Sequence, residues 1–510
     1  MSDRIPPRPP PAPPPSPPPA FPPLPPRWSP LPPLPPPPLH PRRSGLLTTI
    51  AIVACLGVTG VAIYLVTDDG GVEHPDEWDE RVVDLVAFVE DERGLPFEHP
   101  VAVDFLTPQQ YSERTRIDES ELSREDRRLI EDGTAPLRAL GLVPAGFDAL
   151  ESANELSDTA TLAYYDPLRE RITVRGTEMT PDLRVTVAHE LVHVLQDQHF
   201  DLDVMLDDGD PTADRLSGYL ALIEGDATRI QEAYVDSLSG PDRERYLDAM
   251  GQASGDAEEQ LGNIPGVLVA IQGAPYALGP ALVELIAAEG GNDAVDDAFE
   301  DPPASTEHMV DPRSYFAGDS ADDVTVPVVP TGGEQIGEDD RLGALPLFLL
   351  LSERIDPLEA LSAADGWGGD AYVAYDRGGT PCMDLAVRGD STRDGEEVLR
   401  AFEAWVAAGP PGAAQVRSDG DLAVVTACDP GDRGDPSGLA VDALTLPAAR
   451  AQVMWAAGGS AGDVDSAFAA ADCFVRTVPL DQLVEVNESP EPPAGVMAAI
   501  DRAVADCRVR

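Results

Sequence analysis

The feature that most constrains this chain of 510 residues is an uncharged apolar segment of 22 residues, Gly45 to Val66. A helix of that length spans the hydrocarbon core of a bilayer. Two consecutive arginines, the second of which is Arg43, lie just before the segment, and two consecutive aspartates, the first of which is Asp68, lie just after it. Because basic residues favour the cytoplasmic side, we expect an uncleaved single transmembrane helix with a cytoplasmic N-terminus. Everything after about residue 67 is then extracellular.

Residues 1–44 form a tail dominated by proline, with runs such as Pro13 to Pro15 and Pro35 to Pro38. Such a composition cannot bury enough apolar surface to build a core, so we expect a disordered tail with polyproline II character. The tail acts either as a simple spacer or as a ligand for a proline-recognising partner in the cytoplasm. Composition alone leaves both roles open.

Acidic side chains dominate the chain, with 91 Asp and Glu against 35 Lys and Arg and a net charge of −56. A surface this negative repels the phosphates of nucleic acid and the headgroups of an anionic membrane. It also favours solubility, which suits a domain outside the cell. The charge therefore excludes nucleic acid as a partner and leaves the apolar segment as the contact with the membrane.

Cysteine usage agrees with an extracellular domain. Besides Cys55 in the apolar segment, the chain has Cys382, Cys428, Cys473 and Cys507. An even number of cysteines in an oxidising compartment predicts disulfides, and four cysteines allow three pairings. Proximity in sequence favours Cys382 with Cys428 and Cys473 with Cys507. The short spacing of a zinc-binding cysteine cluster is absent from this sequence.

Apolar periodicity predicts an α+β fold after the membrane segment. We divide that part into residues 67–340 and a C-terminal α+β region, 341–510, which holds the disulfides. The clearest elements of the first region are helices over 76–92, 180–198, 215–238 and 278–289, a strand over 99–106 and a hairpin over 162–175. Those of the second are a helix over 347–351, a glycine-rich turn at 366–370, strands over 371–374 and 422–425, and helices over 397–408, 440–456 and 495–506.

The helix expected over 180–198 carries the pattern His-Glu-x-x-His at His189, Glu190 and His193. Residues four apart share one face of a helix, so the two imidazoles can hold the same Zn²⁺. Glu190 lies beside the open coordination position, where a carboxylate can take a proton from water. Apolar neighbours such as Leu191 and Leu195 indicate that the helix is largely buried. The pattern therefore predicts a zinc site with its own general base.

A catalytic zinc site needs a third protein ligand and leaves its fourth position to water. His199 follows His193 by six residues, the spacing of the long metzincin motif, but Gln196 stands where that motif has a glycine. Without the glycine, a continuing helix directs His199 away from the metal. Glu224 lies on the next strongly predicted helix, which can pack antiparallel and direct a carboxylate at the metal. Spacing alone leaves His199 and Glu224 as alternatives.

From Glu190 to about residue 230 the chain resembles the gluzincins, a group of zinc metallopeptidases that includes thermolysin and the bacterial collagenases. Their second helix supplies a glutamate ligand, followed in several branches by Gly-x-Ala, as Glu224 is here. The resemblance implies that Glu224 is the third ligand. The chain departs from thermolysin at Thr228, where an acidic residue would orient the first histidine. Asp226 is the nearby candidate for that outer role.

The resemblance extends more diffusely to about residue 315, through segments 275–279, expected to open a helix, and 302–308. These segments are similar to parts of little-studied predicted membrane peptidases of the same group. Strands that lead into a buried His-Glu-x-x-His helix are the layout of a zincin. In that fold the edge strand of a small sheet can pair with an extended peptide over the metal. The resemblance thus implies a zincin-like metallopeptidase domain over residues 67–340.

Motif and resemblance together imply a membrane-anchored extracytoplasmic zinc metallopeptidase acting on a peptide or protein substrate. Zn²⁺ held by His189, His193 and Glu224 lowers the pKa of its water for attack on a peptide bond. Glu190 takes the proton from that water and passes it to the leaving amine.

The oxyanion formed in that reaction needs a second stabilising group beside the metal. Tyr276 and His308 are the candidates for this role. The alternative to an enzyme is a catalytically inactive zincin-like binding module of the cell envelope. Glu190 argues against the module, because a zinc site that only stabilises the fold has no need of a general base.

Overall fold

The computed structural model describes residues 74–160, 162–202, 212–434, 436–457, 464–489 and 492–508. The expected proline-rich tail and the transmembrane segment Gly45 to Val66 lie outside these residues. Within them, one helix, α10 (Gly266–Gly290), is long and apolar enough to cross a membrane by length and composition. Most of that helix is buried inside the protein, as in the core helix of a folded domain, so it is weak evidence for a membrane span.

The described chain has an α+β fold, as the sequence predicts. Before residue 301 its α-helices are α2 (Val83–Arg93), α3 (Pro108–Thr115), α4 (Arg124–Leu140), α5 (Ala149–Ala160), α6 (Pro181–Phe200), α8 (Ala213–Ser237), α9 (Gly240–Leu261), α10 and α11 (Asn292–Glu300). The later α-helices are α12 (Glu307–Val310), α13 (Pro312–Ala317), α14 (Ala344–Ser352), α15 (Pro357–Ala364), α16 (Thr392–Ala408), α17 (Leu439–Ala443), α18 (Thr445–Ala456), α19 (Val464–Thr477), α20 (Leu480–Glu488) and α21 (Ala494–Arg508). The strands are β1 (Ala102–Leu106), β2 (Ala163–Asp166), β3 (Arg171–Arg175), β4 (Glu334–Asp340), β5 (Trp367–Asp376), β6 (Pro381–Gly389), β7 (Ala414–Asp419) and β8 (Leu422–Cys428).

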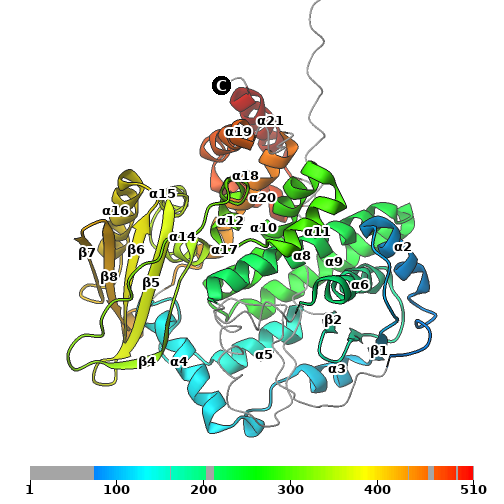
Figure 1. Ribbon diagram of the computed structural model, residues 1–510, viewed down its shortest axis with the longest axis horizontal. Coiled ribbons are helices and arrows are strands. Elements are labelled where there is room, and N and C mark those ends of the chain that lie inside the picture. The colour runs from blue at the N-terminus through cyan, green and yellow to red at the C-terminus, as the bar shows by residue number, and fades with distance from the viewer. Residues whose placement is uncertain are drawn as a thin grey trace, which may run out of the picture.

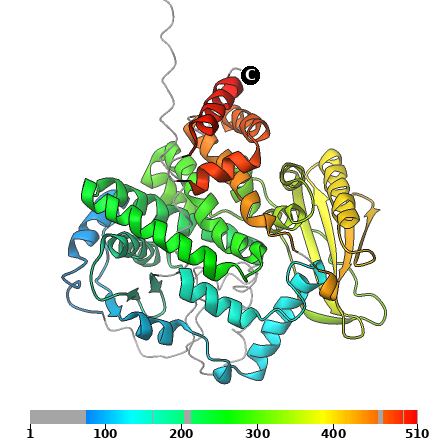
Figure 2. The same ribbon diagram turned by 180° about the vertical axis from the view of Figure 1, so that it is seen from behind.

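A helical body separates two sheets (Figure 1). Figure 1 shows the five-stranded sheet at the left, the three-stranded sheet at the lower right, and α8, α9 and α10 between them. The helices from α18 to α21 lie together at the top, and the view from behind in Figure 2 gives the same arrangement. The metal-binding pattern therefore lies on the side of the molecule that carries the small sheet, because α6 packs against β2 and β3.

The three-stranded sheet has the order β1-β3-β2, with β1 parallel and β2 antiparallel to β3. The pairing of β2 with β3 confirms the hairpin predicted over 162–175. The central strand buries Ile172 and Val174 in the apolar cluster that also contains Leu191 and Leu195 of α6. At the edge of the sheet, the Tyr165 hydroxyl donates a hydrogen bond to an Asp197 carboxylate oxygen, 2.7 Å away. The hairpin is thereby fixed against the motif helix.

The five-stranded sheet is antiparallel throughout, in the order β4-β5-β6-β8-β7. Its first strand, β4, precedes residue 341, so the sheet begins before the division drawn from the sequence. The glycine-rich turn expected at 366–370 is wrong, because β5 starts at Trp367. A Cβ at Gly369 would lie 2.4 Å from the carbonyl oxygen of Asp322. Gly369 is therefore needed because another part of the backbone approaches the strand closely there, and not because the chain turns.

Helix α10 shows that the expected helix start at Pro275 is also wrong. The helix begins at Gly266 and continues through both Pro275 and Pro280. Each internal proline removes one backbone hydrogen bond. Apolar residues on both sides of the prolines, including Val267 and Leu285, are buried, and this burial stabilises the helix through the interruptions.

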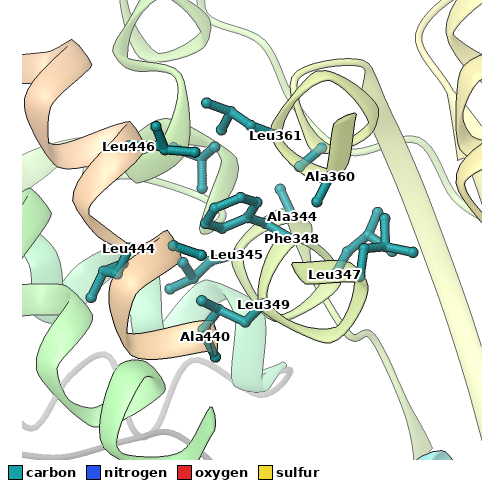
Figure 3. Packing of buried hydrophobic residues seen from close by; sticks show 14 of the residues in the cluster. Ala344, Leu345, Leu347, Phe348, Leu349, Ala360, Leu361, Ala440, Leu444 and Leu446 are labelled. Carbon is teal, nitrogen blue, oxygen red and sulfur yellow. The ribbon is translucent and has the colours of Figure 1, made fainter. Parts of the chain in front are cut away.

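The largest apolar cluster joins the two regions into which we divided the extracellular part. At its centre is α14, the predicted helix over 347–351 in a longer form, with every residue except Pro346 buried. Figure 3 shows Phe348 of α14 in the same group of apolar side chains as Leu361 of α15 and Leu446 of α18. The same cluster includes Leu278 of α10. The two regions therefore share one core.

The four cysteines form two disulfides, Cys382–Cys428 and Cys473–Cys507, as predicted from their proximity. The first joins directly opposed residues of β6 and β8. The second joins α19 to α21 near the end of the chain. Disulfides persist in oxidising compartments, so the pairing agrees with a location outside the cytoplasm.

Candidate metal centre

Helix α6 brings the two motif histidines together. It starts with Pro181, whose missing N–H costs nothing in the first turn of a helix. His189 and His193 are 6 % and 9 % exposed, so both imidazoles lie inside the protein. Their Nε2 atoms are 3.1 Å apart and their ring planes meet at 84°. The one-turn spacing thus points both nitrogens at the same place.

Helix α8 supplies Glu224, the ligand implied by the resemblance. One carboxylate oxygen, Oε2, lies 3.1 Å from Nε2 of His189 and 3.5 Å from Nε2 of His193. Burial alone would raise the pKa of Glu224, but the charge of His193 and hydrogen bonds from both histidines lower it to about 2. The structure therefore brings His189, His193 and Glu224 into one cluster with an ionised carboxylate.

The glycine that follows Glu224 in the sequence Glu-Gly-x-Ala has a structural reason. A Cβ at Gly225 would lie 2.5 Å from the backbone of Gly279, and one at Gly279 would lie 2.3 Å from the carbonyl oxygen of Ala221. Helices α8 and α10 therefore touch through their backbones immediately beside the ligand. This contact places Tyr276 of α10 near the cluster, with its ring centroid 6.3 Å from that of His189.

The hydroxyl of Tyr276 is buried and forms no hydrogen bond of ordinary geometry among the described residues, although Glu224 lies close enough to accept its proton. Burial, together with the negative charges of Glu224 and Glu190, raises the pKa of Tyr276 well above its ordinary value. The hydroxyl therefore stays protonated. The acceptor beside it is Glu224, so the hydroxyl is a protonated donor at the ligand cluster.

Glu190 is 4 % exposed and follows His189 directly in the chain. Burial raises the pKa of Glu190, against the opposing charges of His193 and His189. The backbone N–H of Tyr165, in the edge strand β2, donates a hydrogen bond to this carboxylate. The raised pKa moves Glu190 towards the range in which a carboxylate both takes and returns protons near neutrality.

A buried polar chain orients His193. Its Nδ1 lies 2.9 Å from Oε1 of Gln196, and the Gln196 amide nitrogen donates to the carbonyl oxygen of Ile223 and to Asp226, at 3.0 and 3.1 Å. Two acceptors fix the direction of the amide, so Nδ1 of His193 must be the donor to Oε1. Nε2 is then the atom of His193 that faces Glu224. Burial lowers the pKa of His193, but the charge of Glu224 and the hydrogen bond to it raise that pKa to about 9, so Nε2 carries a proton that a metal ion would displace.

Asp226 is held in turn by Arg93, the last residue of α2. The guanidinium Nε donates to Asp226 over 2.9 Å, and both side chains are almost completely buried. Arg93 also pairs with Asp296, at 2.6 Å. Arg229 adds a longer contact of 3.3 Å to the second Asp226 oxygen. The chain from His193 to Arg93 therefore ties the histidine to three helices.

The ligand atoms fit a tetrahedral zinc ion. Bonds of about 2.0–2.1 Å to nitrogen and oxygen place neighbouring ligands about 3.3–3.4 Å apart. The three separations in the cluster are 3.1, 3.1 and 3.5 Å. The ionised carboxylate and the two imidazoles are a donor set for a cation, which would displace the proton that Glu224 stabilises on His193. Both the donor set and its polarity therefore suit zinc.

Replacing Gln196 by Leu is expected to weaken zinc binding by about 10–100-fold, the usual effect of losing an outer partner of a histidine ligand. The leucine removes the acceptor at His193 Nδ1 and leaves Asp226 one donor short. Competition with a chelator of known affinity measures the change. Gln109→Leu, at an exposed position on α3, is the matched control. Equal affinity in Gln196→Leu and the parent would show that the amide has no part in orienting His193.

Two sequence candidates lie elsewhere. Nε2 of His199 contacts the carbonyl oxygen of Pro96, at 2.7 Å, and is not among the clustered ligand atoms. Nδ1 of His308 accepts from the N–H of Ala304 and Nε2 donates to the carbonyl oxygen of Asp319, at 3.3 and 3.1 Å. Both nitrogens of His308 are thus engaged with backbone. No described contact joins His308 to the metal cluster.

The sequence reasoning missed Arg93 and the role of Gln196. Gln196 had one available signal, since it is a polar residue one turn after His193 on a helix otherwise judged to be buried. Arg93 had none, because it meets Asp226 only through the packing of α2. Thr228, at the position that departs from thermolysin, has a buried hydroxyl with no hydrogen-bond partner among the described residues. Nδ1 of His189 is likewise buried and has no hydrogen-bond partner among them.

A family described as a domain of unknown function (DUF8575) matches residues 334–464. The match covers the five-stranded sheet, from β4 to β8, and the helices from α14 to α18, and it ends at the first residue of α19. It does not include the metal cluster. No curated protein and no solved structure matches the chain.

Proposed function

We propose that the chain is a zinc metallopeptidase that hydrolyses peptide bonds outside the cell. The observation that carries the proposal is the convergence of His189, His193 and Glu224 from two helices, with Glu190 beside them and buried. A metal site that only stabilises a fold is closed by four protein ligands, whereas three ligands leave a position for substrate or water. When bound, zinc would supply Lewis acidity, lowering the pKa of water towards ~7 and polarising a carbonyl group.

Glu190 acts as the general base in this proposal. Its raised pKa suits a carboxylate that takes a proton from the attacking water and returns it to the leaving amine. The Tyr165 N–H holds the carboxylate in place. Gln196 fixes the orientation of His193, so this ligand stays in place while Glu190 takes and returns the proton.

Tyr276 is the favoured oxyanion donor. Its hydroxyl is protonated, buried and close to Glu224, so it is a donor at the place where negative charge would develop on the carbonyl oxygen. His308 is less suited, because both of its ring nitrogens already bond to backbone. We therefore assign the donor role to Tyr276.

The edge strand β2 provides a surface for an extended peptide. Among the described strands it pairs with β3 alone, and Leu162 accepts a hydrogen bond from Arg175 on that side. Because alternate residues of a strand face opposite sides, the backbone groups of Ala163 and the carbonyl group of Tyr165 face away from β3, while the Tyr165 N–H is bonded to Glu190. A peptide strand added there would lie beside Glu190, which contacts Tyr165.

The location we propose is the outer face of the cell membrane, with the segment Gly45 to Val66 as a single anchor. The two disulfides favour an oxidising compartment. The length and composition of the segment favour a membrane span.

The experiment that tests this function is a comparison of the full chain with its Glu190→Gln variant on an unfolded protein carrying a fluorescent label. Mass spectrometry of the products identifies cleaved peptide bonds. Fragments released by the parent and not by the variant support a peptidase. No fragments from a zinc-loaded parent would favour the inactive binding module.

A further inference from the structure

Three side chains from separate segments meet at a second place on the motif side of the protein. His74 precedes α2, His99 precedes β1, and Glu170 lies in the turn between β2 and β3. Oε2 of Glu170 lies 3.4 Å from Nδ1 of His74 and 3.3 Å from Nε2 of His99. The two imidazole centroids are 3.8 Å apart. The ligand atoms of all three residues lie within 4.8 Å of one another.

Hydrogen bonding does not account for this cluster. Oε2 of Glu170 is buried, yet it forms no hydrogen bond of ordinary geometry with any described residue. Its partners are the two imidazoles, 3.4 and 3.3 Å away, which neutralise the carboxylate only when they are protonated. Nδ1 of His99 lies 3.3 Å from the carbonyl oxygen of Pro100, which can only accept a proton. The same Nδ1 lies 3.4 Å from the amide nitrogen of Gln198, which can only donate, so Nδ1 faces one acceptor and one donor.

The backbone at Glu170 adds a second observation. Its φ of 44° lies in the left-handed region, which non-glycine residues other than asparagine and aspartate seldom adopt. Glu170 is the last residue of the four-residue turn that returns the chain to β3, so the hairpin itself holds this conformation. Here it belongs to the one side chain that both histidines face.

We propose that His74, His99 and Glu170 bind a second zinc ion. Two imidazole nitrogens with one carboxylate oxygen are a ligand set that zinc accepts. The separations of 3.3 and 3.4 Å match the edges of about 3.3–3.4 Å expected for ligands around tetrahedral zinc. The side chains of His74, His99 and Glu170 are 35 %, 31 % and 23 % exposed, so the ion enters from solvent and water completes its coordination.

The second ion stabilises the end of the active-site helix. The Gln198 amide nitrogen donates to the carbonyl oxygen of His99 over 3.0 Å, and Oε1 of Gln198 accepts from the N–H of Glu98 over 2.8 Å. Gln198 lies on α6, five residues after His193. An ion bound by His74, His99 and Glu170 would therefore join the segment around His74, which follows the expected membrane anchor, to the hairpin. Through Gln198 it would also hold this part of the chain against α6. Its role is structural and does not depend on the proposed peptidase activity.

Zinc bound per chain tests the proposal. The full chain, the double variant His74→Ala/His99→Ala and the single variant Glu170→Gln are stripped with a chelator, dialysed against the same low free zinc and analysed for metal. We expect both variants to hold one zinc fewer than the parent. His199→Ala is the matched control, because His199 lies outside the cluster, and it should keep the parent's zinc content.

Circular dichroism establishes that each variant is folded. If the double variant unfolds, the zinc content of Glu170→Gln, which preserves side-chain size, tests the second site. The same comparison in a His189→Ala/His193→Ala background separates the two sites, because one zinc should remain there and disappear with Glu170→Gln. Equal zinc in the parent and in folded Glu170→Gln would overturn the second site.

Discussion

Replacing Glu190 by Gln is expected to slow peptide hydrolysis by about 10²–10⁴-fold, the usual contribution of a positioned general base. Glutamine has nearly the size of glutamate, so packing around this 4 % exposed side chain should survive. Its amide cannot take a proton from water. The three metal ligands are untouched, so zinc content should equal that of the parent.

The measurement is the initial rate of cleavage of a labelled unfolded protein, with zinc determined on the same samples. Glu178→Gln, made at an exposed glutamate before α6, is the matched control and should cleave at the parent's rate. Turnover by Glu190→Gln within a few-fold of the parent would remove Glu190 from the mechanism and leave the base unidentified.

Replacing Tyr276 by Phe is expected to lower kcat by about 10²–10³-fold, as removal of one oxyanion donor does in other hydrolases. The phenyl ring keeps the contact with His189, whose centroid lies 6.3 Å away. The lost hydroxyl forms no hydrogen bond of ordinary geometry among the described residues, with Glu224 as the acceptor beside it, so its removal should cost the fold little stability. KM should change little, because the oxyanion exists only after attack.

Steady-state kinetics on a cleaved peptide identified from the labelled protein separate kcat from KM. Tyr246→Phe is the matched control, since Tyr246 is a buried tyrosine on α9. Its hydrolysis should be unaffected. A Tyr276→Phe variant with the parent's kcat would transfer the oxyanion role to another group and make the buried hydroxyl a feature of packing alone.

The grouping of the metal ligands follows from information that is local in the sequence. His189 and His193 share a face because they are one turn apart, and no tertiary contact is needed to predict this. Glu224 required a resemblance, because many helix positions offer a glutamate. The glycine that follows it now has a physical reason in the contact of α8 with Gly279.

Other features were beyond prediction because they depend on contacts distant in sequence. Arg93 and Asp226 are separated by 133 residues and meet only when α2 packs beside α6 and α8. The start of α10 was misplaced because proline normally interrupts a helix, whereas burial of its apolar residues maintains this one through Pro275. His74, His99 and Glu170 likewise give no pattern in the sequence, since each comes from a different segment.

The strand that begins at Trp367 was mistaken for a turn for a related reason. Glycines at 366, 368 and 369 are typical of turns. In the fold, the carboxylate of Asp370 accepts hydrogen bonds from the N–H groups of Leu342 and Gly343 and from the indole of Trp367. The bonds from Leu342 and Gly343 are long-range, so local composition does not reveal how the segment is held in the sheet.

The most direct test of the metal centre is the zinc content of the full chain compared with that of its His189→Ala/His193→Ala variant, by elemental analysis after dialysis against metal-free buffer. The arrangement of His189, His193 and Glu224 predicts that the parent holds one zinc per chain more than the variant. Equal zinc in the two proteins, with the variant shown to be folded, would contradict a metal site on α6 and α8 and with it the proposed peptidase.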